Sequence, residues 1–157
     1  MLKTAFRNFI SALMIASLFL VSPAFAGQKE DAIALVKKGI AFYKKNGEAK
    51  TMEAITDKGM LQKGDLYLWV IQTDFKKKAI VVAHGTNKTI PGKEWYNVKD
   101  PDGKYFIREV CDKAQKKGNG WVEYRWAHPR LKKAKPKVTY LERVNYLIFM
   151  CGYYKID

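Results

Sequence analysis

Apolar and polar residues follow two different periods along the chain, and each period predicts one kind of element. Apolar residues recur at helical spacing from Lys29 to Tyr43, over residues 49–57 and over residues 104–117. Five other stretches are rich in branched and aromatic residues, lie between turn residues and predict strands. These strands are expected over residues 65–73, 79–85, 121–127, 138–144 and 147–155.

The order of these elements predicts an antiparallel α+β domain. The polar turn at residues 74–78 is short enough for a hairpin, so the first two strands should be antiparallel neighbours. Residues 86–104 form a long polar loop, and a loop of this length inside a compact domain is usually functional. We therefore expect a crevice beside His84, which ends the second strand.

The third strand carries large aromatic residues on both faces. A period of two places Val122, Tyr124 and Trp126 on one face, and Trp121 with its charged neighbours on the other. One interpretation is a core strand. The other is the wall of a small-molecule pocket, because tyrosine and tryptophan combine an apolar surface with a hydrogen-bonding group. This segment alone leaves both interpretations open.

Residues 1–26 have the features of a secretory signal peptide. A positively charged start precedes an apolar run over residues 9–21, and residues 24–26 fit the small-residue cleavage rule. We expect cleavage after Ala26 and one domain over residues 27–157, a length that supports a single core. The alternative is a retained membrane anchor, although the apolar run is shorter than the ~20 residues that a membrane-spanning helix needs.

The charge is strongly basic: 29 Lys and Arg against 15 Asp and Glu give a formal net charge of +14. Such a charge attracts anions. Because the lysines are scattered and no nucleic-acid-binding motif appears, we interpret them as solvated surface and expect no nucleic acid partner.

The sequence also argues against catalysis. Residues 27–157 contain no serine and no zinc-protease motif, and the two histidines form no cluster at metal-ligand spacing. His84 and His128 could in principle form a catalytic dyad with Glu123, but no motif in the sequence supports it. We therefore predict a protein that is not an enzyme and holds no cofactor or metal. The two cysteines, Cys111 and Cys151, could form a disulfide in an exported protein, or remain two buried thiols.

Several motifs occur in the order found in single Cache domains, and together they cover nearly all of residues 27–157. They are Gly64 to Tyr67, Ala83-His84-Gly85 with Asn87, Asp100 to Gly103 before Phe106, Gly120 to Trp126 with Pro129, Lys137 to Tyr140, and Cys151 to Lys155. The resemblance implies a PAS-like five-stranded antiparallel sheet with a long N-terminal helix behind it. Helices and loops on the other face would enclose a ligand pocket.

The same resemblance implies an extracytoplasmic sensor-type domain that binds a short organic acid or a similar carboxylate metabolite. A lysine cation beside histidine, hydroxyl and indole donors suits such a ligand, because charge-assisted hydrogen bonds are strong. Tyr140 would face the same side as Lys137 only if Lys137 still lay in the preceding loop. The ligand-binding candidates are His84, Tyr124, Trp126 and Lys137, with Tyr67, Trp69 and Tyr140 as further members.

No signalling module or second transmembrane helix follows within the chain, so we expect the free-standing form, secreted or periplasmic. Such a protein could signal only through a separate membrane receptor or kinase. The alternative function is a basic secreted interaction module that binds polyanions or a partner receptor through its surface. Binding to polyanions should weaken steeply with salt, whereas pocket binding should depend less on it. The oligomeric state stays open.

Overall fold

The computed structural model describes residues 23–57 and 59–155. Most of the predicted signal peptide therefore lies outside the described residues, and its cleavage stays a prediction. Pro23 to Ala26 are the first residues of the N-terminal helix. Within the described ranges, no helix has both the length and the apolar character needed to cross a membrane.

The described chain contains three helices and six strands, and each predicted helix and strand is present. The helices are α1 (Pro23–Asn46), α2 (Glu48–Thr56) and α3 (Phe106–Lys117). The strands are β1 (Gln62–Lys63), β2 (Leu66–Thr73), β3 (Ala79–His84), β4 (Asn119–Ala127), β5 (Ala134–Val144) and β6 (Leu147–Tyr154). The two-residue strand β1 was not predicted, because two exposed polar residues carry no periodic signal.

The main sheet is antiparallel throughout, in the order β3-β2-β6-β5-β4, and β1 pairs with the start of β2. The predicted β2–β3 hairpin is confirmed. At the β5–β6 turn Asn145 has a φ of 55°, a left-handed conformation that asparagine tolerates better than most residues. This tight turn sets the register of β5 and β6.

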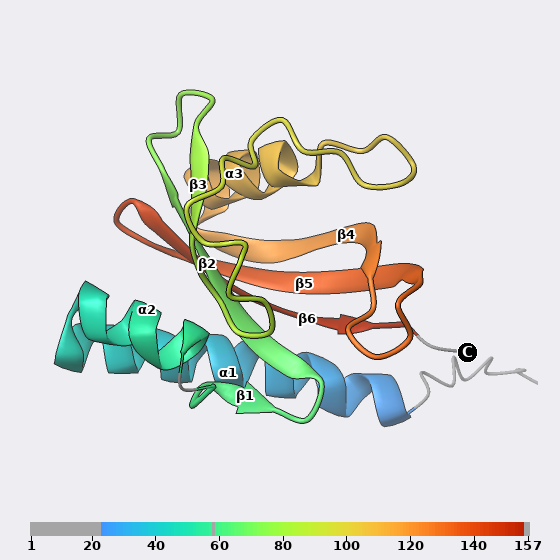
Figure 1. Ribbon diagram of the computed structural model, residues 1–157, viewed down its shortest axis with the longest axis horizontal. Coiled ribbons are helices and arrows are strands. Elements are labelled where there is room, and N and C mark those ends of the chain that lie inside the picture. Colours follow the sequence, from blue (N-terminus) through green and yellow to red (C-terminus); the bar gives the residue numbers. More distant parts are fainter. Residues whose placement is uncertain (1–22, 58, 156–157) are drawn as a thin grey trace, which may run out of the picture.

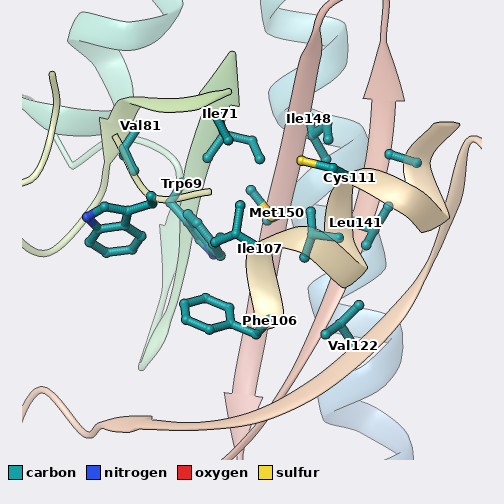
Figure 2. Close-up of a cluster of buried hydrophobic side chains, with 14 of the residues drawn as sticks. Trp69, Ile71, Val81, Phe106, Ile107, Cys111, Val122, Leu141, Ile148 and Met150 are labelled. Atoms are coloured by element: carbon teal, nitrogen blue, oxygen red, sulfur yellow. The ribbon is translucent and has the colours of Figure 1, made fainter. Parts of the chain in front are cut away.

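The helices cover opposite faces of the sheet. Figure 1 shows α1 and α2 along one face, and α3 with the long loop of residues 85–105 on the other. Because side chains alternate along each strand, the sheet has one core on the α1 side, with Val36 and Phe149, and one on the α3 side. Figure 2 shows the core on the α3 side, where Ile107 lies beside Leu141 and Met150 of the sheet.

A disulfide between Cys111 and Cys151 is not present, and both residues are buried free thiols. Cys111 belongs to the core on the α3 side, whereas Cys151 belongs to the core on the α1 side. The sheet therefore separates the two sulfur atoms. Of the two possibilities that the sequence left open, the structure shows buried thiols.

Candidate functional site

A buried lysine lies at the centre of the candidate site, on the α3 side of the sheet. Lys137 on β5 is 1% exposed, and its Nζ donates a hydrogen bond of 2.7 Å to the Tyr67 hydroxyl on β2. The same Nζ lies 4.3 Å from the ring centroid of Tyr67 and 5.0 Å from that of Tyr154. Within residues 23–57 and 59–155, no carboxylate forms an ion pair with Lys137.

Gly152 leaves the space that this lysine occupies. Strand β6 lies between β2 and β5, so Lys137 must cross β6 to reach Tyr67. A Cβ atom at position 152 would lie 2.8 Å from Cε of Lys137, 2.9 Å from the Val138 carbonyl oxygen and even closer to Thr139 Oγ1. Only glycine therefore fits beneath the lysine side chain.

Lys137 is a cation in this environment. Burial lowers its pKa, because a charge loses its hydration, but coulombic attraction to Tyr67, Tyr124 and Tyr154, together with the hydrogen bond to the Tyr67 hydroxyl, acts in the opposite direction and outweighs this effect. The pKa of Lys137 therefore lies above its usual value. Among the described residues, no carboxylate is one of the groups that set this pKa.

His84 brings a neutral imidazole to the same face of the sheet. Its ring centroid lies 5.1 Å from that of Tyr67 and 6.4 Å from that of Trp69. Burial, together with repulsion from Lys137, lowers the pKa of His84 from 6.5 to about 3. Its Nδ1 accepts a hydrogen bond of 3.4 Å from the Thr86 backbone N–H, so the proton of the neutral ring resides on Nε2, which can donate.

Aromatic side chains complete the walls. Tyr124 stacks on Phe106 with ring centroids 4.2 Å apart, and its hydroxyl lies 3.0 Å from that of Thr139. Trp126 contacts Phe106 as well. The Nε1–H donor of Trp69 is buried and has no hydrogen-bond partner in the described structure. Burying such a donor without a partner costs roughly 1–3 kcal/mol.

A cavity of about 190 Å³ opens beside these residues, with Tyr67, His84 and Trp126 in its lining. Lys137, Tyr124 and Trp69 are buried next to this lining rather than in it. The volume is below the roughly 300–1,000 Å³ of sites for drug-sized ligands, so the cavity suits a small metabolite. We call it the ligand cavity below.

The structure thus brings six of the seven candidates together, and Tyr140 is the exception. Lys137 belongs to the regular part of β5, so residues 137 and 140 face opposite sides of the sheet. Tyr140 packs on Trp121 with ring centroids 5.2 Å apart, and its hydroxyl donates to Glu142. The expectation that Tyr140 would join this cluster is wrong.

The hypothetical catalytic dyad of the histidines with Glu123 is not formed either, because Glu123 is exposed and pairs with Lys155 at 2.7 Å. His128 does lie at the ligand cavity, and the sequence analysis did not include it among the ligand-binding candidates. The signal was present: the alternation that places Tyr124 and Trp126 on this face continues to position 128.

Asp100 attaches the long loop to β4. Its carboxylate accepts hydrogen bonds from the backbone N–H groups of Arg125, Asp102 and Lys104 at 3.0, 3.0 and 2.8 Å. Burial opposes the charged form, but these three donors outweigh it and lower the pKa of Asp100. The loop beside the cavity is thereby fixed to the strand that carries Tyr124.

Other features of the described residues offer less chemistry. A cavity of about 380 Å³ lies between α1 and the β1–β2 turn. Two carboxylates in its lining already have partners, since Asp31 pairs with Lys63 and Asp65 pairs with Arg130. In the described ranges, no group of three His, Cys, Asp or Glu side chains could hold a metal ion.

The order of the strands, with helices on both faces of the sheet, defines a PAS-like α+β domain, and the small cavity lies between the sheet, the long loop and the β4–β5 turn. The chain belongs to the Cache domain family, because the family model for the Cache domain matches residues 29–153. The predicted resemblance and fold are confirmed.

Three solved structures have similar folds. The periplasmic sensor domain of a chemotaxis protein is 22% identical, with a TM-score of 0.67, and the match covers 87% of this chain and 99% of that one. A methyl-accepting chemotaxis protein from Vibrio parahaemolyticus is 20% identical, with a TM-score of 0.70 and coverages of 83% and 90%. The third structure, described as the structural basis for carboxylic acid recognition by a Cache chemosensory domain, is 23% identical, with a TM-score of 0.69 and coverages of 85% and 97%.

Proposed function

We propose that this protein is an extracytoplasmic sensor-type domain that binds a short organic acid or a similar carboxylate metabolite without catalysis. The observation that carries the proposal is the buried ammonium group of Lys137, which has the Tyr67 hydroxyl but no described carboxylate as a partner. A buried ion without a counterion is costly, by several kcal/mol. A ligand carboxylate would supply the missing negative charge.

The surroundings of Lys137 support the same ligand class. The hydroxyl of Tyr67 and the Nε2–H of neutral His84 are donors at the ligand cavity, and Trp126 adds an apolar wall. A carboxylate prefers donors and a cation to other acceptors. The structural neighbour whose subject is carboxylic acid recognition supports this choice, although the likeness itself concerns the fold.

Two of the structural neighbours belong to chemotaxis proteins, and this supports a sensory role. We infer that the bound acid is reported to a separate membrane receptor or kinase. The extracytoplasmic location rests on the predicted signal peptide and on the description of one neighbour as a periplasmic sensor domain.

Calorimetry with acetate, propionate, pyruvate and succinate tests the proposal on the wild type, Lys137→Met and Lys45→Ala. We expect Lys137→Met to lose about 30-fold or more in affinity, since breaking a buried charge pair costs about 2–5 kcal/mol. The variant should still fold, because an apolar side chain of similar volume often replaces a buried ion without loss of stability. Lys45 is exposed near the end of α1 and serves as the control.

Equal affinities in all three proteins would remove Lys137 from the site. Binding of polyanions that weakens steeply between low and physiological salt, without binding of any small acid, would favour the basic interaction module instead.

A further inference from the structure

His128 holds the turn between β4 and β5 with one ring nitrogen. Its Nδ1 accepts hydrogen bonds from the backbone N–H groups of Arg130 and Leu131, at 3.2 and 3.3 Å. A nitrogen that accepts these bonds carries no proton, so the neutral imidazole has its proton on Nε2. The tautomer of His128 therefore follows from the turn, and Nε2 is a donor.

This donor has no partner in the part of the chain that the structure describes. His128 is 1% exposed, and its Nε2 is buried without a hydrogen bond. Buried donors are nearly always paired, because an unpaired one loses its bond to water and gains nothing in return. The side chain borders the ligand cavity, together with Tyr67, His84 and Trp126. An acceptor on a bound molecule would complete the arrangement.

The His128 donor lies close to the Lys137 cation. The imidazole centroid is 4.6 Å from the ring centroid of Tyr154, and Lys137 Nζ is 5.0 Å from the same centroid. The imidazole centroid and the ammonium nitrogen are therefore at most about 10 Å apart, and a hydrogen bond of about 2.9 Å at each end leaves room between them for a carboxylate with a neighbouring acceptor.

We propose that His128 Nε2 is a specificity-determining donor, which selects acids that carry a second acceptor over the corresponding simple acids. The second acceptor is a hydroxyl or an oxo group next to the carboxylate. The inference rests on the proposed function, because it places the ligand carboxylate at Lys137. It goes further by naming the chemical class of acid and the residue that recognises it.

His128 also borders the larger cavity beside α1, whose lining includes Asp31. We assign Nε2 to the ligand cavity because the other donors, Tyr67 and His84, gather there. The variant Asp31→Asn separates the two possibilities, since Asp31 lines the larger cavity and does not line the ligand cavity.

The test compares matched acids by calorimetry on the full chain: acetate with glycolate, propionate with lactate, and propionate with pyruvate. We expect the wild type to bind at least one hydroxy or oxo acid about tenfold more tightly than its simple partner, as one hydrogen bond to a buried donor allows. His128→Asn should reduce this preference to about twofold or less and change the affinity for the simple acid by no more than about threefold. Asparagine keeps an acceptor for the turn and removes Nε2.

A second measurement requires no substitution. In a histidine-labelled wild type, the NMR signal of the His128 Nε2–H should shift on addition of the preferred acid and much less on addition of its simple partner. This reading distinguishes a ligand contact from a purely structural role in the turn.

Three results would overturn the inference: no preference in any pair, a preference that His128→Asn retains, or a preference that Asp31→Asn abolishes equally. In each case the simple acids would still bind through Lys137, so the proposed function would stand. If no acid binds to the wild type, the proposed function fails and this inference fails with it.

Discussion

Mild acid should destabilise this protein through His84. The folded protein lowers the pKa of His84 to about 3, because the ring is buried and Lys137 lies nearby, whereas the unfolded chain has the ordinary value of 6.5. Between these two values the unfolded chain binds a proton that the folded protein does not bind. Stability is therefore complete above pH 6.5 and falls as the pH decreases from 6.5 toward 3.

The size of the effect follows from the two values. A pH of 5 lies about 1.5 units below the pKa of His84 in the unfolded chain, so protonation of His84 stabilises the unfolded chain by roughly 2 kcal/mol. A domain of this kind has about 5–15 kcal/mol of total stability, so the loss is easily measured. The contribution is specific to His84, because its pKa is lowered by its own burial and by Lys137.

Urea denaturation of the wild type and His84→Asn at pH 7 and pH 5 measures the loss of stability that protonation of His84 causes. Asparagine can accept the hydrogen bond from the Thr86 backbone N–H, as Nδ1 does, but does not titrate. Carboxylates titrate in both proteins and cancel in the comparison. The wild type should lose about 2 kcal/mol more than the variant between the two pH values. An equal loss in both proteins would show that His84 is protonated without penalty in the folded state.

Two further predictions concern packing. Gly152→Ala should lower the free energy of unfolding by about 1–3 kcal/mol and weaken acid binding, because the added Cβ would press on Lys137. The control Gly27→Ala, which has open space around the added Cβ, should do neither. Unchanged stability of Gly152→Ala would show that Lys137 moves freely. After denaturation without reductant, Cys111 and Cys151 should both react with a thiol reagent. In the native protein both should stay protected, since burial raises their pKa values to about 11 and 12. A disulfide, within one chain or between two, would contradict this prediction.

The secondary structure could be predicted because each element carries a clear local signal. Residues 106–117 show helical spacing and end at Gly118, whose φ of 78° is the left-handed conformation typical of a helix end. The start of β5 was predicted too late, at residue 138 instead of Ala134. Residues 130–137 are rich in lysine, contain Pro136 and look like a loop, but pairing with β4 keeps residues 134–137 extended.

That late boundary also explains the error over Tyr140. With Lys137 placed in a loop, Tyr140 could be expected on the same face, whereas the real strand separates them. The family pattern supplied Lys137, His84 and the aromatic residues, but it said nothing of His128. Hydrogen-bond satisfaction is a property of three-dimensional contacts, so only the structure could show that no group in the described ranges pairs with Nε2 of His128.

The two nitrogen atoms of His128 link the ligand cavity to the shape of its rim. Nδ1 holds the β4–β5 turn through Arg130 and Leu131, while Nε2 is buried at the cavity and has no partner among the described residues. The loop on the other side is attached to β4 by Asp100 and has less freedom to adjust. An acid that accepts a hydrogen bond from Nε2 would therefore stabilise the imidazole that keeps the turn closed. The ligand contact and the β4–β5 turn would then share one side chain, so binding at Nε2 would bear on the turn as well.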